Sequence, residues 1–332
     1  IGAPPPDAPY YVLDAGAGEG TVISTFLTAL HKKIPRAPVA VAAKEISIDD
    51  ICILLGYLPD RFAEHKLLAF HITNLSYREM AAPEKAKFLH VKKELRGDTS
   101  HDFGLQLMNM AGFVKKHWAL EAAEAGGVLR PRRKIVLSIY RKDQKTALAK
   151  ILPPHAPPLP REFDFVIASH PMRLRRPPAE TAALVVAPLL QMVRAGGKMI
   201  LSYASGRDFS RALLRFLYPK TTPYQYAAPG FLLRALTKIP SCAAVARAAR
   251  VSSFRYGFIN LYLGRKNFSL GNILSLWKAV AYVGQISETE QRAAGGLDLP
   301  RRMREKLAAV KDMSFANYAV HFRKPRARKK RA

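Results

Sequence analysis

The chain has 332 residues, of which 49% are apolar, and its formal net charge is +28 at pH 7. The apolar share is that of a globular protein and excludes a disordered chain. Apolar runs such as Leu184–Met192 are much shorter than the roughly 20 residues that cross a bilayer, so we expect no membrane partner. The charge exceeds what a small-metabolite enzyme needs. It favours a polyanionic partner, RNA or DNA, over the alternative of a generally basic or mitochondrial protein.

The two cysteines, Cys52 and Cys242, lie far apart and form no C-x-x-C pair. They predict neither a disulfide framework nor a zinc site, and we expect no bound metal.

The first elements along the chain form one strand–helix–strand unit. Tyr10–Asp14 has the composition of a short buried strand, apolar residues at helical spacing predict a helix over Thr21–Lys33, and Val39–Ala43 is typical of a second strand. A turn with three glycines joins the first strand to the helix. This order predicts a right-handed βαβ unit.

The following segment, 47–133, is mainly helical in pattern and longer than a βαβ repeat needs, which predicts a helical insertion or an elaborated layer. A short strand within it is predicted at Leu67–Thr73. Regular α/β alternation then resumes, with predicted strands at Lys134–Tyr140, Phe163–Ser169 and Lys198–Tyr203, a helix at Glu180–Arg194 and a break at Ala195–Gly197.

Beyond Asp208 we predict helices at Phe209–Leu217, Phe231–Arg250, Leu270–Gln285 and Arg301–Lys311, and strands at Tyr256–Leu263 and Phe315–Phe322. The whole pattern predicts an α/β three-layer sandwich with a mostly parallel sheet and helical insertions. We divide it into a first βαβ unit (1–46), the insertion (47–133), the rest of the core (134–264), a second helical insertion with the last strand (265–322) and a basic tail (323–332).

The turn after the first strand is Asp14-Ala15-Gly16-Ala17-Gly18-Glu19-Gly20. Glycines let the backbone approach a nucleoside, and the following helix presents free amides. A dinucleotide site favours G-x-G-x-x-G and pyrophosphate, which Asp14 would repel; the acid suits a ligand with an amino group and a sulfonium. The turn resembles the first motif of the Rossmann-like class I S-adenosylmethionine-dependent methyltransferases, in which an acid precedes G-x-G-x-G.

Further residues extend this resemblance. It implies that Glu45, at the end of the second strand, holds the ribose hydroxyls, and that Asp143, taken as the acid after the third strand, lies near the adenine. Phe163–Ala168 resembles the fourth strand of the family, and Leu189–Lys198 resembles the helix and turn before the fifth. The resemblance thus implies a cofactor site for S-adenosylmethionine made of Asp14, Gly16, Gly18, Gly20, Glu45, Asp143 and Ser169.

Each of these residues has a structural alternative. The glycines suit a tight turn in another α/β protein, Glu45 suits a surface position at a strand end, and Asp143 lies among basic residues, as a solvated loop charge does.

The methyl acceptor is expected to lie after the fourth strand, where the chain reads Ser169-His170-Pro171-Met172. This run lacks the second proline and the aromatic residue typical of amino-directed nucleic-acid methyltransferases, and neither cysteine lies near it. His170 is a candidate general base; a loop histidine bonded to the backbone is an equal alternative. The acceptor motif therefore matches no subtype.

Three basic clusters are predicted to contact nucleic-acid phosphates, although each alone is also typical of a solvated surface. They consist of Arg130, Arg132, Arg133 and Lys134; of Arg173, Arg175 and Arg176; and of Arg326, Arg328, Lys329, Lys330 and Arg331 in the tail. The tail is equally a candidate nuclear localisation signal.

The predicted function is an S-adenosylmethionine-dependent methyltransferase, or methyltransferase-like protein, that acts on RNA or a ribonucleoprotein, with ribosomal RNA and ribosomal proteins as the expected partners. The alternatives are a catalytically weak RNA-binding assembly factor of a mitochondrial ribosome, a small-molecule methyltransferase, and a nicotinamide-dependent oxidoreductase, which Asp14 disfavours. A basic, cysteine-poor chain that begins at Ile1 suits a mitochondrial matrix protein without its leader, with nucleus and cytoplasm as alternatives.

Overall fold

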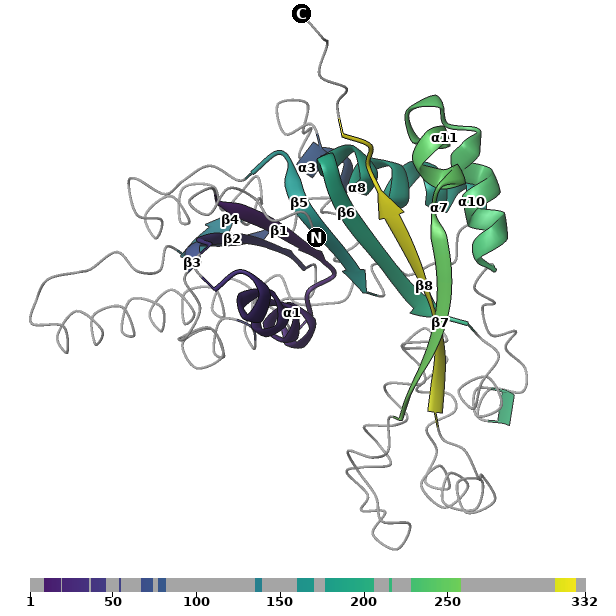
Figure 1. Cartoon of the computed structure of the whole chain (residues 1–332). Coiled ribbons are helices and arrows are strands. Elements are labelled where there is room, and N and C mark those ends of the chain that lie inside the picture. The colour runs from purple at the N-terminus through teal and green to yellow at the C-terminus, as the bar shows by residue number, and fades with distance from the viewer. Residues whose placement is uncertain are drawn as a thin grey trace, which may run out of the picture. The chain divides into compact units, whose positions relative to one another are not determined.

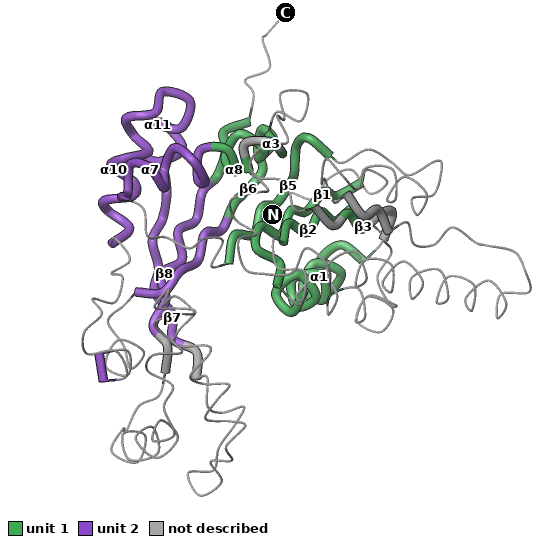
Figure 2. The backbone as a smooth tube through the Cα atoms, turned by 180° about the vertical axis from the view of Figure 1, so that it is seen from behind, with its two compact units in different colours: residues 1–169, 188–199, 323–332 green, residues 170–187, 200–322 purple. Residues whose placement is uncertain are grey.

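The structure is a computed structural model that describes residues 9–18, 20–35, 37–45, 54, 67–73, 77–81, 135–138, 160–169, 177–205, 215–216, 228–257 and 314–326. The chain divides into two compact units (Figure 2). Unit 1 contains Ile1–Ser169, Pro188–Met199 and Arg323–Ala332, and unit 2 contains His170–Ala187 and Ile200–Phe322.

Unit 1 is built on a sheet whose strands follow the order β4-β3-β2-β1-β5, with the first part of β6 beside β5. The strands are β1 (Tyr10–Ala15), β2 (Val39–Lys44), β3 (Leu67–Thr73), β4 (Ile135–Ser138), β5 (Phe163–Ser169) and β6 (Val193–Ala204). The pairs β1–β2, β1–β5, β2–β3 and β3–β4 are parallel. Apart from β4, which lies outside β3, this is the order of a doubly wound Rossmann-like sheet.

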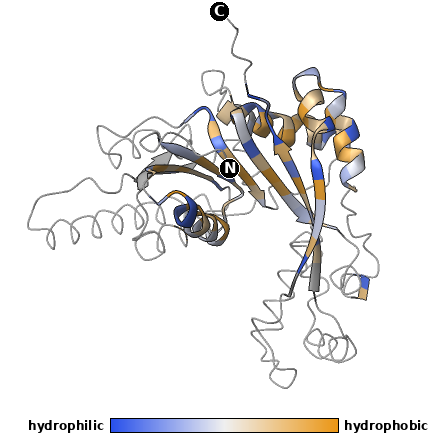
Figure 3. Ribbon diagram, in the orientation of Figure 1, coloured by the Kyte–Doolittle hydropathy of each residue, from blue (hydrophilic) through white to orange (hydrophobic). Residues whose placement is uncertain are grey.

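Apolar strands and helices on both sides make unit 1 a three-layer structure. All of β2 is buried, as expected for a parallel strand covered on both faces, and Figure 3 shows apolar residues along the central strands. Helix α1 (Thr21–Lys33) buries Ile23, Leu27 and Leu30. Figures 1 and 2 show α1 on one side of this sheet, and α3 (Tyr77–Ala81) and α8 (Ala187–Met192) on the other.

Unit 2 combines the second part of β6 with β8 (Ser314–Arg323) and β7 (Arg250–Gly257), in the order β6-β8-β7. Strands β7 and β8 are antiparallel, from Arg250 opposite His321 to Gly257 opposite Ser314. The helices are α7 (Pro178–Thr181), the π-helical segment η2 (Ala182–Val186), α10 (Pro229–Thr237) and α11 (Pro240–Arg247). Helix α10 packs against α7, η2 and α11.

The predicted fold class, α/β with a mostly parallel sheet, is confirmed, and so are the three elements Thr21–Lys33, Leu67–Thr73 and Phe163–Ser169 with the bounds that the sequence predicts. The helix predicted over Phe231–Arg250 is instead two helices, because Pro240 lacks an amide hydrogen and begins a new helix. The strand predicted from Tyr256 begins earlier, at Arg250, where its pairing with β8 fixes it, and residues 258–263 lie outside the described residues.

The prediction that Ala195–Gly197 is a break between a helix and a strand is wrong, because these residues belong to strand β6. Helix α8 ends at Met192, and Gly196, at φ 82°, donates its amide to the carbonyls of Lys324 and Pro325. Lys324 in turn donates its amide to the Gly197 carbonyl and its ammonium to the Val193 carbonyl, 2.6 Å away. From the local sequence, a glycine pair indicates only the end of a helix. The place of this pair in β6 depends on Lys324 and Pro325, which come about 130 residues later in the chain.

A second correction concerns the third strand of the sheet. The prediction gives this place to Lys134–Tyr140, but the strand beside β2 is β3, and Ile135–Ser138 forms β4 outside it. The insertion predicted over 47–133 therefore contains a strand of the central sheet. The helices predicted at Leu270–Gln285 and Arg301–Lys311 lie outside the described residues, and the predicted segment boundaries stay predictions. None of the helices described reaches the length and apolar character of a membrane span.

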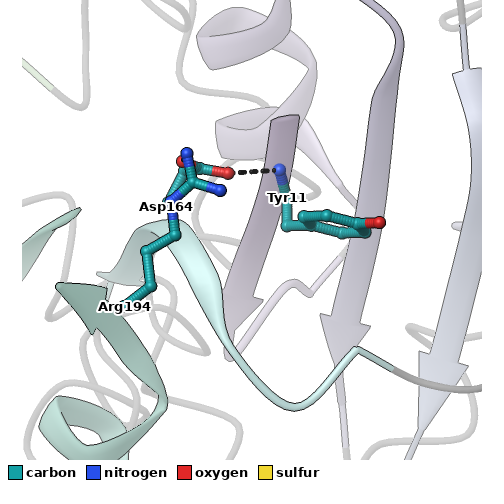
Figure 4. Close-up of polar contacts among 3 residues, drawn as sticks. All are labelled: Tyr11, Asp164 and Arg194. Atoms are coloured by element: carbon teal, nitrogen blue, oxygen red, sulfur yellow. Dashed lines mark hydrogen bonds and ion pairs between the residues drawn. The ribbon is translucent and has the colours of Figure 1, made fainter. Parts of the chain in front are cut away.

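Asp164 ties the amino ends of β1 and β5 together (Figure 4). Its carboxylate accepts the Tyr11 amide at 2.8 Å and forms an ion pair with Arg194, while the side chain is only 5% exposed. Burial raises the pKa of Asp164, and the Tyr11 amide and Arg194 oppose that rise. The Phe-Asp opening of this strand thus has a structural role.

Asp164→Ala should lower the free energy of unfolding by roughly 2 to 3 kcal/mol, because the Tyr11 amide loses its acceptor and Arg194 its partner. Asp164→Asn keeps an acceptor for the amide and should cost about 1 kcal/mol. Urea denaturation followed by circular dichroism measures both values. Equal losses for the two variants would contradict a role for the Tyr11 hydrogen bond.

Candidate functional site

The candidate site lies at the carboxyl end of the unit 1 sheet, where the strand order changes direction. Strand β1 lies between β2 and β5, and its residue Asp14 is in register with Ala43 and Ile167. The chain enters this sheet at β1 and leaves on one side through β2 and on the other through β5. Such a switch point is where ligands bind in open α/β sheets.

The glycine loop, residues 16–20, is held to the end of β2 by its own amides. Gly16 and Ala17 donate to the Lys44 carbonyl at 2.9 and 3.0 Å, and Gly18 donates to the Glu45 carboxylate at 2.7 Å. Gly20 then begins α1. The loop is therefore fixed in place before any ligand binds.

All three loop glycines have a left-handed backbone, with φ of 94° at Gly16, 50° at Gly18 and 80° at Gly20. Their surroundings differ. A β-carbon on Gly20 would lie 2.4 Å from a methyl carbon of Leu54, whereas a β-carbon on Gly18 would meet no atom within 4 Å. A side chain at Gly20 would thus collide with Leu54, whereas Gly18 leaves open space beside the loop.

Gly20→Ala should lower the free energy of unfolding by roughly 2 to 4 kcal/mol, since the left-handed backbone and the contact with Leu54 both oppose the methyl group. Combining it with Leu54→Ala should cost less than the sum of the two single changes, because the second change removes the clash. Denaturation of the three variants measures this coupling. Additive losses would show that Leu54 does not oppose the methyl group.

Asp14 is fully buried next to this loop. Among the described residues, neither of its carboxylate oxygens has a hydrogen-bond partner. Burial raises the pKa of Asp14 to about 7, the Glu45 carboxylate adds to the rise, and the Ile23 backbone amide opposes it without meeting hydrogen-bond geometry. A buried carboxylate without a partner is costly, so a cationic group placed against it would be held strongly.

Glu45 and Lys44 continue this cluster at the end of β2. Both side chains are 8% exposed. The Lys44 ammonium lies 4.9 Å from the centre of the Tyr77 ring, on α3. The carboxylate of Glu45 thus lies close enough to act on Asp14, and the neighbouring Lys44 ammonium is held by an aromatic ring.

The structure brings together five of the seven residues predicted for the cofactor site and places a sixth at the end of the neighbouring strand. Asp14, the three glycines and Glu45 form one cluster, and Ser169 ends β5, the neighbour of β1. Asp143 and His170 lie outside the described residues. Because β3 is the strand beside β2, the end of β3 at Thr73 takes the place in the sheet order from which Asp143 was predicted to act.

Of the predicted basic clusters, only Arg326 falls in the part of the chain that the structure describes. Its side chain is exposed, and its stem lies 3.0 Å from where a β-carbon on Gly196 would be. The other basic residues lie outside: Arg130, Arg132, Arg133, Lys134, Arg173, Arg175, Arg176, Arg328, Lys329, Lys330 and Arg331. No group of three or more His, Cys, Asp or Glu side chains in the described ranges could hold a metal ion.

Sequence reasoning missed two contributors to the site. The carbonyl of Lys44 anchors two loop amides, and Leu54 fills the space beside Gly20. A backbone carbonyl leaves no sequence signal. Leu54 comes from a segment predicted only as helical, so its contact with the loop depends on the tertiary fold.

Comparison with known proteins gives matches among solved structures alone, since no protein-family profile and no curated protein matches the chain. Phosphoethanolamine N-methyltransferase 2 of Haemonchus contortus, in complex with phosphomonomethylethanolamine and S-adenosylhomocysteine, has a TM-score of 0.36 and 11% identity. The same enzyme in complex with S-adenosylmethionine has a TM-score of 0.34 and 11% identity. Both matches cover 97% of this chain and 50% of the enzyme.

A coclaurine N-methyltransferase bound to N-methylheliamine and S-adenosylhomocysteine has a TM-score of 0.33 and 10% identity, over 95% of this chain and 65% of the enzyme. The chain therefore spans about half to two thirds of the length of these proteins. All three structures are of N-methyltransferases.

Proposed function

We propose that this chain is a class I S-adenosylmethionine-dependent methyltransferase, or a methyltransferase-like protein, that acts on RNA or a ribonucleoprotein. One observation carries the cofactor part of this proposal. Asp14 is buried without a described hydrogen-bond partner, beside a glycine loop that leaves open space at Gly18.

The residues present fit this cofactor. Asp14 and Glu45 place negative charge where the amino group and the sulfonium need it, and the carboxylate of Glu45 suits ribose hydroxyls. When bound, the cofactor supplies an activated methyl group. The chain itself holds the loop backbone through Lys44 and Glu45, so that the ligand meets a preformed surface.

The affinity for S-adenosylmethionine should fall roughly tenfold from about pH 7 to about pH 5.5, because Asp14, with a pKa of about 7, becomes protonated and loses its attraction for a cation. The ligand amino group, with a pKa of about 8, stays charged over this range. Asp14→Asn should bind more weakly and show a flat profile. Calorimetry at the two pH values measures this, and an equally flat wild-type profile would contradict the role of Asp14.

The RNA part of the proposal is supported by charge. The net charge of +28 is not needed to bind S-adenosylmethionine, whose sulfonium is itself positive. The tail contains seven basic residues from Arg323 to Arg331, of which Lys324 donates its ammonium to the carbonyls of Gln191 and Val193. An RNA-binding assembly factor with weak or no catalysis is supported by the same charge and by the unmatched run Ser169–Met172.

One experiment separates these two functions. RNA that co-purifies with the full chain is isolated and incubated with the protein and with S-adenosylmethionine labelled in its methyl group. Label in RNA, absent with Asp14→Asn, is the result expected of the methyltransferase. Tight RNA binding without label supports the assembly factor, whereas label in small molecules and no bound RNA would overturn the RNA proposal.

A further inference from the structure

Strand β7 is exposed in an unusual way for a strand in a sheet. Every side chain from Arg250 to Arg255 is exposed, including Val251 at 47% and Phe254 at 43%. In the part of the chain that the structure describes, no strand pairs with the outer edge of β7. Large apolar side chains on an edge strand are a liability unless they have a binding role.

The alternation of side chains shows which residues share a face of this strand. Arg250, Ser252 and Phe254 lie on one face of β7, and His321 of β8 is opposite Arg250. The Ser252 hydroxyl and the His321 ring nitrogen Nε2 are 3.1 Å apart, which places them on the same face.

On β8, His321 is exposed, but Ala319, on the same face and opposite Ser252, is buried, as are Val320 and Phe322 on the other face, so the exposed area consists of β7 and the His321 end of β8. Farther along β8, Asn317 is buried opposite Phe254, which therefore lies at the border of the exposed area. We call Arg250, Ser252, Phe254 and His321 the β7 outer face.

The described part of unit 2 is strongly basic. Residues 228–257 contain five cations and no acid, and Glu180 is the single acid in the described part of unit 2. The five cations, all exposed, are Arg234, Lys238, Arg247, Arg250 and Arg255. A second aromatic, Phe231, is 57% exposed and lies 4.6 Å from the Arg234 guanidinium. This charge complements a polyanion.

We propose that the β7 outer face binds a single-stranded segment of RNA, an inference that rests on the RNA part of the proposed function. Phe254 offers a stacking surface for one base, Arg250 a charge for the phosphates, and Ser252 and His321 polar groups for base edges. An exposed sheet face with an aromatic ring and cations suits unpaired bases, which can stack, better than a duplex, whose bases are covered.

The test measures binding of the full chain to a fluorescein-labelled 20-nucleotide oligouridine by anisotropy at two salt concentrations. Phe254→Ala should weaken binding at least about fivefold, and Phe254→Tyr should restore it, because stacking needs a ring. Arg250→Ala should weaken binding several-fold and reduce the slope of affinity against salt by about one. The matched control is Arg255→Ala, which removes the same charge from the opposite face of β7.

Three results would overturn this assignment. If Arg255→Ala weakened binding as much as Arg250→Ala, the attraction would be general rather than local. If Phe254→Ala left the affinity unchanged while the wild type bound RNA, RNA would bind elsewhere and the proposed function would stand. If the wild type bound no RNA but self-associated, and Phe254→Asp abolished that association, β7 would be a protein interface and the RNA proposal would fall, although S-adenosylmethionine binding could still be present.

Discussion

Gly18→Arg should reduce the affinity for S-adenosylmethionine at least about a hundredfold and leave the fold intact. The side chain has room, since no atom lies within 4 Å of the position of its β-carbon. A left-handed backbone at φ 50° costs a non-glycine residue about 1 to 2 kcal/mol. The arginine would fill the open space, and its charge would compete for Asp14 and Glu45.

The control for this variant is Gly18→Ala, which has the same backbone cost but adds one methyl group. Thermal denaturation should give similar midpoints for the two variants, while calorimetry should show a much larger loss of affinity for arginine. If both variants bound the cofactor like the wild type, the space at Gly18 would not be a ligand site and the loop would be only a tight turn.

Asp14→Asn should raise the free energy of unfolding by about 3 kcal/mol near pH 7.5 and change it little near pH 4. Asp14 has a pKa of about 7 in the folded chain against 3.8 in the unfolded one, so the folded state holds the proton more tightly. Its contribution to stability is therefore lost as the pH rises from about 4 to about 7, and the asparagine removes that loss.

His71 has the opposite effect over nearly the same pH range. It is buried in β3, and burial lowers its pKa from 6.5 to about 4, so the stability of the folded state falls as the pH falls from about 6.5 to about 4. The two groups should largely cancel in the wild type. Asp14→Asn should then reveal a stability that rises with pH by about 3 kcal/mol, and His71→Gln one that falls by a similar amount.

Urea denaturation at about pH 4.5, 5.5 and 6.5 tests this opposition, with the double variant as the control that should be flat. A fall in stability for Asp14→Asn at neutral pH would show that the Asp14 carboxylate is ionised and already satisfied, which would remove the reason to expect a cationic ligand there.

The sequence predicted the parts of the site that depend on local pattern. The strand Tyr10–Ala15, the loop glycines and α1 follow one another in the chain, so their types and spacing suffice, and the end of β2 follows from the βαβ unit. Parts that depend on distant pairing were not predictable. The strand Leu67–Thr73 was predicted but its place beside β2 was not, and the place of Gly196 in β6 depends on Lys324 and Pro325.

The roles of single residues show the same division. Glu45 was predicted from its place at a strand end, but its hydrogen bond to the Gly18 amide was not, because the direction of a side chain depends on the folded loop. Likewise the contact of Arg326 with Gly196 gives a predicted RNA-binding residue a packing role as well, which only the folded chain could show.

A calorimetric titration of the full chain with S-adenosylmethionine near pH 7, beside Gly18→Arg, tests the cofactor site most directly. The wild type should bind one ligand saturably, and Gly18→Arg should bind none. No binding to the wild type at about 1 mM ligand, a concentration at which even a weak site is half filled, would contradict the assignment of the Asp14 and glycine-loop site.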